Sequence, residues 1–256
     1  MEIICLYVLI GLIGGITAGM LGLGGGIIFV PGLMLIHKYY NYFEGYELQA
    51  AVFTSLICII FAGSTSAYLH NRNQLIDTRI VKNFSSYVTA GCFFGIYILE
   101  YTSTEILENI YSMILIILAL LLISDAKIIK NNINVVQKIG SLYFFSNGIV
   151  SSLMGIGGGT LSVPYLSFII GDIKKSIATA SAIGLVIALS SMVFIYIINS
   201  DIYINKVNHI SLILIIPASV IGSYCGVYLL RILNPDRVKH LFSVLLLFVA
   251  LYLLFE

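Results

Sequence analysis

The strongest constraint on this chain is a ten-residue stretch that occurs twice. It reads GLGGGIIFVP at residues 22–31 and GIGGGTLSVP at residues 155–164, with six identical positions at an offset of 133, about half of the 256 residues. Each copy holds four glycines within five positions. Because a glycine inside a helix costs roughly 1 kcal/mol relative to alanine, we expect the helix to break at both places.

The remainder of the chain is too apolar for a soluble domain. Hydrophobic residues make up 59% and charged residues 10%, with a mean hydropathy of +1.04, whereas soluble domains have roughly 25% charged residues. Apolar stretches such as 110–124 and 241–255 lack the alternation of barrel strands. We therefore predict an all-α polytopic protein of the cell (inner) membrane, forming a single transmembrane domain over residues 1–256. The net charge of +1, without a basic run longer than two lysines, argues against nucleic-acid binding.

The first apolar region, residues 3–36, has an awkward length. As one helix it would measure roughly 50 Å against a hydrocarbon core of about 30 Å, and two full crossings would need about 40 residues. The region is thus too long for one crossing and too short for two, whereas a re-entrant hairpin with a glycine break fits its length. The second half of the chain repeats this arrangement. The expected hairpin arms are 3–20 with 27–36 in the first half and 139–154 with 160–170 in the second. The expected spans are 50–69, 80–99, 106–124, 176–198, 210–230 and 238–255. The two repeats cover about 1–125 and 137–256 and are joined by a loop at 125–137.

The orientation of the two repeats follows from the lysines and arginines. If each broken segment crosses the membrane once, the repeats are parallel and the basic residues divide seven to six between the two sides. If each is a hairpin, the repeats are inverted and the division is eleven to two, which obeys the positive-inside rule. We therefore predict inverted repeats with both termini on the non-cytoplasmic side. The eleven are Arg72, Arg79, Lys82, Lys127, Lys130, Lys138, Lys174, Lys175, Arg231, Arg237 and Lys239, and the two are Lys38 and Lys206.

The second arms begin at the glycine breaks, so their free N–H groups and positive dipole ends point into them. Such ends bind anions without a cationic side chain. The alternative is that the glycines only let helices cross closely, as we also expect of the Gly91/Gly95 and Gly222/Gly226 pairs, within the protomer or in a homo-oligomer. Hydroxyls at the start of the following spans add donors, unless they bond back to their own helix. The predicted substrate-binding residues are Gly22, Gly24, Gly25, Gly26, Pro31, Thr54, Ser55, Gly155, Gly157, Gly158, Gly159, Thr160, Pro164, Thr179 and Ser181.

Other chemistry finds little support in the residue pattern. No acidic or basic residue lies well inside a predicted span, so a coupling ion is not visible. The four histidines fall near span ends, where we expect them to be solvated or interfacial, and neither they nor the four scattered cysteines have metal-ligand spacing. No histidine or acid is placed to activate Ser55 or Ser181. We expect no enzyme, no metal and no cofactor.

With its doubled glycine element, each copy ending in Val-Pro and followed by a hydroxyl-bearing span, the chain resembles the sulfite exporter TauE/SafE family over its whole length. The positions that carry the resemblance are Gly22, Gly24, Gly25, Gly26 and Pro31, their counterparts Gly155, Gly157, Gly158, Gly159 and Pro164, and the Thr54-Ser55 element. Ser181-Ala182 replaces Thr-Ser in the second copy. The resemblance implies a permease for small sulfur-containing anions such as sulfite or organosulfonates.

Both lines of reasoning predict a permease that moves a small anion through the lipid bilayer by alternating access. A passive anion channel or pore is the alternative, and an accessory subunit whose glycine breaks serve packing alone is a third. A coupling ion and a homo-oligomer stay open, as do the direction of transport and the exact anion.

Overall fold

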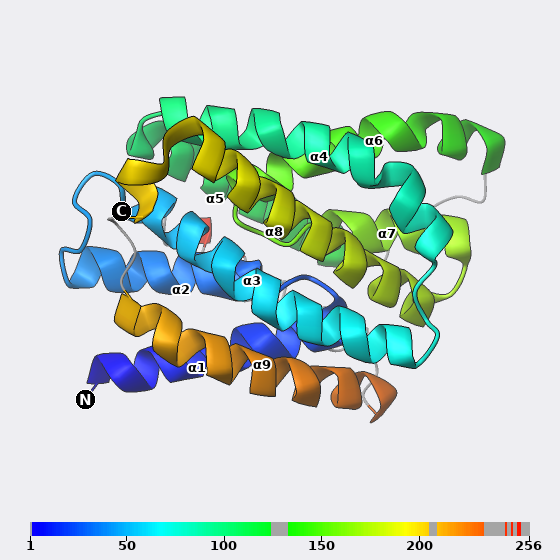
Figure 1. Cartoon of the computed structure of the whole chain (residues 1–256), viewed down its shortest axis with the longest axis horizontal. Helices are drawn as coiled ribbons and strands as arrows, with labels where there is room; N and C mark the ends of the chain where they lie inside the picture. Colours follow the sequence, from blue (N-terminus) through cyan, green and yellow to red (C-terminus); the bar gives the residue numbers. More distant parts are fainter. Residues whose placement is uncertain are drawn as a thin grey trace.

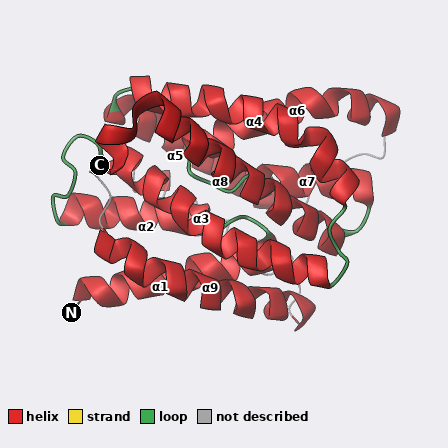
Figure 2. Cartoon of the chain, in the orientation of Figure 1, coloured by secondary structure: helices red, strands yellow, loops and turns green. Residues whose placement is uncertain are grey.

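The computed structural model describes residues 2–123, 133–204 and 209–232, together with four later positions, 244, 247, 250 and 251. All of the regular structure in these ranges is α-helical (Figure 2), which confirms the predicted fold class for the described part of the chain. The helices are α1 (Glu2–Leu21), α2 (Gly26–Tyr39), α3 (Glu47–Arg72), α4 (Thr78–Tyr101), α5 (Thr104–Ile123), α6 (Ile133–Leu153), α7 (Gly159–Ile170), α8 (Ile173–Ile204) and α9 (His209–Ile232).

Both glycine stretches interrupt the helix where the sequence predicts it. Helix α1 stops at Leu21 and α2 begins at Gly26, while α6 stops at Leu153 and α7 begins at Gly159. Figure 1 shows that α2 runs back toward the end of the molecule where α1 begins, and that α7 runs back in the same way toward the start of α6. The reversal needs glycine because five residues there have the positive φ angles that side chains disfavour: Gly22, Gly24, Gly25, Gly155 and Gly158.

Most helix bounds agree with the sequence prediction to within a few residues. The exceptions are α6, which begins at Ile133 rather than at residue 139, and α8, which ends at Ile204 rather than at residue 198. The last part of the expected loop 125–137 is therefore helical. The earlier part of that loop and most of the expected span 238–255 lie outside the described residues.

Several helices have the length and composition of membrane spans. Among the described residues, α1, α3, α8 and α9 are long and apolar enough to cross a membrane, while α2 and α7 are shorter apolar helices of 14 and 12 residues. At 1.5 Å per residue, α2 and α7 extend about 20 Å, less than the hydrocarbon core of about 30 Å. The chain is a multi-pass membrane protein, and α2 and α7 are too short to cross the hydrocarbon core by themselves.

The helix pairings of the two halves match one another. Helices α3 and α8 pack together in the centre of the molecule (Figure 1). Helix α1 packs along α9 and α4 along α6, while α2 packs on α3 and α7 on α8. The corresponding helices are α1 and α6, α2 and α7, α3 and α8, and α4 and α9. When each helix is replaced by its counterpart, the α1–α9 pair becomes the α6–α4 pair and the α2–α3 pair becomes the α7–α8 pair, and all of these pairs are present.

The two Gly-x-x-x-Gly pairs produce backbone contact between helices of the same protomer. A Cβ atom at Gly91 of α4 would lie 2.1 Å from the carbonyl oxygen of Phe145 in α6, and one at Gly222 of α9 would lie 2.4 Å from that of Leu12 in α1. Gly226 makes the same approach to the carbonyl of Ile16, at 2.2 Å. The expected close packing within the protomer is confirmed.

We predict that Gly91→Ala destabilises the protein because its Cβ atom would collide with a backbone oxygen that cannot rotate away. Overpacking of this kind costs about 1–3 kcal/mol, which corresponds to a fall of roughly 2–12 °C in melting temperature for a chain of this size. Thermal unfolding of the detergent-solubilised protein measures the effect.

The matched control is Gly63→Ala in α3, where the nearest atom is Ile59 Cγ2 at 3.8 Å. This variant should unfold at or above the wild-type temperature, since alanine favours helix. Equal melting temperatures for the two variants would contradict the contact.

Candidate functional site

The two glycine breaks meet in the interior and touch through their backbones. A Cβ atom at Gly24 would lie 2.8 Å from the Cα of Gly157, and a Cβ atom at Gly157 would lie 2.9 Å from the Cα of Gly24. Both segments are buried. The structure therefore brings together the two repeated stretches that lie half a chain apart in sequence.

The short arms begin at this contact. A Cβ atom at Gly26, the first residue of α2, would lie 2.1 Å from the carbonyl oxygen of Gly155, and one at Gly159, the first residue of α7, would lie 1.9 Å from that of Gly22. Each helix start thus faces a carbonyl of the opposite break. The residues before the starts, Gly25 and Gly158, have no side chain to cap the first N–H groups, so the positive dipole ends of both arms are available to an acceptor.

The predicted hydroxyl residues divide into two kinds. Ser55 Oγ donates a hydrogen bond of 2.8 Å to the carbonyl oxygen of Gly155, so it reaches the break of the other half. Thr54 Oγ1 and Ser181 Oγ instead donate to carbonyls of their own helices. Thr179 is near the start of α8, where its hydroxyl accepts a bond of 3.0 Å from the N–H of Asp77. Thr160, the second residue of α7, is 4% exposed.

The two prolines lie inside the short arms, one turn beyond the breaks. Pro31 is in α2 and Pro164 in α7. A proline inside a helix lacks the N–H that would bond to the carbonyl four residues earlier, which here belongs to Ile27 and Thr160. Each arm therefore lacks one helical hydrogen bond close to its N-terminal end, at equivalent positions.

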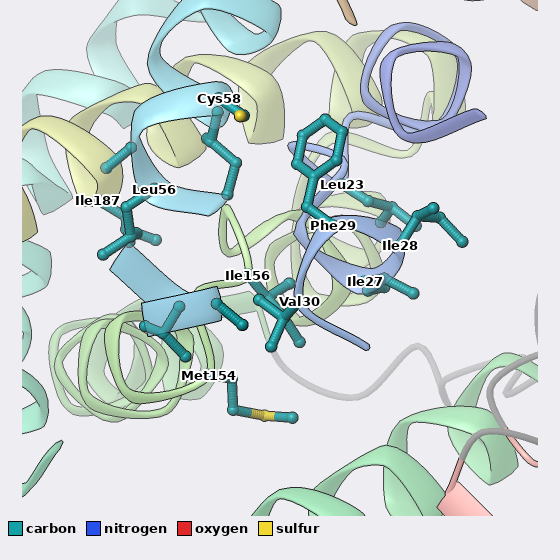
Figure 3. Packing of buried hydrophobic residues seen from close by; sticks show 14 of the residues in the cluster. Leu23, Ile27, Ile28, Phe29, Val30, Leu56, Cys58, Met154, Ile156 and Ile187 are labelled. Atoms are coloured by element: carbon teal, nitrogen blue, oxygen red, sulfur yellow. The ribbon is translucent and has the colours of Figure 1, made fainter. Parts of the chain in front are cut away.

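Apolar side chains surround the contact between the breaks. Figure 3 shows Val30 of α2 next to Ile156 of the second break, with Leu56 of α3 and Ile187 of α8 on one side of them. Val30 and Leu56 are 0% exposed and Ile156 is 1% exposed. The site is therefore enclosed, and its electrostatics come from backbone dipoles and hydroxyls rather than from charged side chains.

A capping group on α3 escaped the sequence prediction. Ser66 Oγ donates to the carbonyl of Ala18 at 3.2 Å, and His70 Nε2 donates to that of Gly19 at 3.1 Å. These carbonyls belong to the last turn of α1, whose final four carbonyls have no partner within the helix. The histidines were expected to be solvated or interfacial, and solvation is wrong for His70 and His37, which are 1% and 0% exposed. The i, i+4 spacing of Ser66 and His70 on an apolar helix was the sequence signal that could have indicated this capping pair. His240 lies outside the described residues.

A polar cluster on the second hairpin also escaped prediction. Asn147 Nδ2 of α6 donates to Ser162 Oγ of α7 at 2.8 Å, and Ser151 Oγ donates to Asn147 Oδ1 at 2.7 Å. All three side chains are at most 2% exposed. Asn147 and Ser151 again have i, i+4 spacing. The sequence prediction included no residue of this arm among the candidate binding residues.

Charged groups stay at the helix ends. The ion pair between Lys38 Nζ and Glu108 Oε2, at 3.2 Å, joins the end of α2 to the start of α5. Among the described residues, no group of three His, Cys, Asp or Glu side chains is arranged to hold a metal ion. An anion at the breaks would thus meet helix dipoles and hydroxyls with little competition from fixed charge.

Comparison with known proteins gives relatives over nearly the whole chain. A probable membrane transporter protein of Bacillus subtilis, YunE, is 26% identical over 271 residues, covering 98% of this chain and 97% of that protein. A probable membrane transporter protein of Methanocaldococcus jannaschii is 24% identical, covering 97% and 94%, and one of Haemophilus influenzae is 27% identical, covering 74% and 72%. No solved structure matches the chain.

The sequence profile of the family described as sulfite exporter TauE/SafE matches residues 7–253, which include both glycine breaks and the helices packed around them. With whole-length relatives that are named as membrane transporters, the chain belongs to the sulfite exporter TauE/SafE family.

Proposed function

We propose that this protein is a permease that moves a small sulfur-containing anion, such as sulfite or an organosulfonate, by alternating access at the two glycine breaks. The observation that carries the proposal is the contact between Gly24 and Gly157, which places the N-terminal ends of α2 and α7 at one buried point. Helix N-termini that converge at a break are suited to hold an anionic group without a buried cation. The description of the family supports a sulfur oxyanion as the substrate class.

The same contact favours a carrier over a passive pore. Gly26 and Gly159 each lie against a carbonyl of the opposite break, and apolar side chains such as Val30 and Ile156 enclose the contact. A passage between the halves has to be opened by moving backbone away from backbone. A binding site that opens by such a movement saturates with substrate, whereas a permanently open pore does not.

Inverted repeats are part of the proposal. Two features support them: the pairing of helices is preserved when the halves are exchanged, and α1 and α6 begin at opposite ends of the molecule (Figure 1). The described charges support the orientation with the α1 start outside. The end at which α1 begins carries Glu44, Glu47, Glu105 and Glu108 with Lys38, and the opposite end carries Arg72, Arg79, Lys82, Lys174 and Lys175 with Asp77 and Asp172.

The transport activity can be measured on purified protein in sealed vesicles. We expect sulfite uptake driven by its own gradient to rise with concentration and then to saturate, and competing organosulfonates to inhibit it. Uptake that rises linearly over the whole range would favour the channel, and uptake equal to that of protein-free vesicles for every anion tested would contradict the permease.

Gly157→Ala tests the role of the contact in the cycle. Gly157 does not adopt a positive φ, so alanine is tolerated locally, but its Cβ atom has to push the Gly24 backbone away from 2.9 Å. We expect saturable uptake to fall at least tenfold while the protein still purifies as a folded species. Gly63→Ala, which meets nothing closer than 3.8 Å, is the control and should keep wild-type uptake. Unchanged uptake by Gly157→Ala would remove the breaks from the mechanism.

The orientation can be tested with single cysteines in a Cys5→Ser, Cys225→Ser background, which lacks the two exposed native thiols. Glu44→Cys lies in the exposed connection between α2 and α3, and Lys174→Cys lies at the exposed start of α8. We expect a membrane-impermeant maleimide to label Glu44→Cys in intact cells and Lys174→Cys only after lysis. The reverse pattern would place both termini in the cytoplasm.

A further inference from the structure

The two hairpins differ in chemistry although they share their geometry. In the second hairpin, Asn147 and Ser151 of α6 and Ser162 of α7 form a hydrogen-bonded cluster with distances of 2.7 and 2.8 Å. The positions 133 residues earlier in the first hairpin are Gly14, Ala18 and Phe29. At these three equivalent positions the second hairpin is therefore polar and the first is apolar.

The correspondence between these positions holds in three dimensions as well as in sequence. Gly148 of α6 lies against the carbonyl of Val88 in α4, and Gly15 of α1, its counterpart, lies against the carbonyl of Ser219 in α9. One turn further along, Ser152 Oγ of α6 lies 3.4 Å from the carbonyl of Cys92 in α4, and Gly19 of α1, its counterpart, lies against the carbonyl of Ser223 in α9. Asn147 and Gly14 thus occupy equivalent places in the two halves.

The first hairpin shows that joining the arms requires no polar group. The ring of Phe29 in α2 fills the space above Gly14, where a Cβ atom would lie 2.1 Å from Phe29 Cε1. One turn further out, Ile10 fills the space at Gly32 in the same way. A polar side chain in the membrane interior has an energetic cost, and apolar packing does the same structural work here. The polar cluster therefore has another purpose.

The cluster lies directly at the N-terminal end of α7. A Cβ atom at Gly158, the residue before the helix, would lie 3.4 Å from Ser151 Oγ and 3.5 Å from Asn147 Oδ1. Asn147 has two amide hydrogens, of which one is donated to Ser162, and the Ser162 hydroxyl has a hydrogen of its own. Both hydrogens belong to a cluster that lies beside the start of α7.

We propose that Asn147 and Ser162 are the residues that recognise the anion, and that the second hairpin binds the substrate while the first provides an apolar wall. Two of the oxyanion oxygens accept hydrogen bonds from Asn147 Nδ2 and Ser162 Oγ, and the start of α7 supplies the positive potential. Ser151 orients the amide by donating to Asn147 Oδ1. This assignment rests on the proposed transport of a small oxyanion, and it locates binding in one half of the protein.

The test compares sulfite uptake by wild type, Ser162→Ala and Asn147→Leu in vesicles. We expect both variants to raise the KM for sulfite at least tenfold. Ser167→Ala is the matched control on the same helix, because Ser167 Oγ donates to the Val163 carbonyl of its own helix at 2.7 Å. Its KM should stay within twofold of wild type. Where Asn147→Leu does not fold, Ser162→Ala decides, since it removes a single oxygen atom.

A charge variant separates recognition from a structural role. Asn147→Asp keeps the size of the side chain but places a carboxylate beside the substrate, so uptake of divalent sulfite should fall more than uptake of a monovalent sulfonate. Wild-type protein that transports none of these anions would overturn the proposed function and this assignment together. Wild-type transport combined with a folded Ser162→Ala of unchanged KM, and an unchanged sulfite to sulfonate ratio for Asn147→Asp, would overturn the assignment alone.

Discussion

The structure depends on how it satisfies helix ends that are buried in its apolar interior. A chain that leaves the helix in the hydrocarbon region exposes carbonyl and N–H groups that lipid cannot pair, each at a cost of several kcal/mol. Helix α3 pairs many of the carbonyls. Ser66 and His70 donate to the last turn of α1, and Ser55 donates to the break that follows α6. A single helix thus serves the breaks of both halves, which explains its central position.

The N–H groups at the breaks are treated differently from the carbonyls. No side chain caps the starts of α2 and α7, because Gly25 and Gly158 precede them, and a backbone carbonyl of the opposite break lies against the first residue of each helix. A carbonyl oxygen is a partial negative charge, so this contact already has the polarity that an anion would have in the same place. Separation of the halves would expose these helix starts, and an anion could then replace the carbonyls without any change in the sign of the local field.

The sequence alone predicted the breaks, the helix bounds and the close helix contacts, because glycine acts through the backbone. A positive φ or a missing Cβ is a local property. The positive φ of Gly24 and the missing Cβ atoms of Gly91 and Gly222 therefore act in the same way whichever direction the helix faces. Side-chain hydroxyls are different. Thr54 and Ser55 are neighbours in sequence, yet one bonds within its helix and the other reaches Gly155, since successive residues on a helix point about 100° apart. Asn147 and His70 were missed for the same reason: their partners belong to other helices.

The chemical difference between the hairpins bears on how a pair of matching halves could transport an anion. Packing of Phe29 over Gly14 and of Ile10 over Gly32 joins α1 and α2 through apolar contacts, where the second hairpin has a hydrogen-bonded cluster. The second hairpin is held by Asn147, Ser162 and the stacked rings of Tyr143 and Tyr165, whose centroids are 4.2 Å apart. If the anion binds to the second hairpin, it has to stay with α7 while the apolar first hairpin moves across it. An apolar surface forms no hydrogen bonds with the anion, so the first hairpin can move past the bound anion without breaking any. The energy barrier between the two access states is then low.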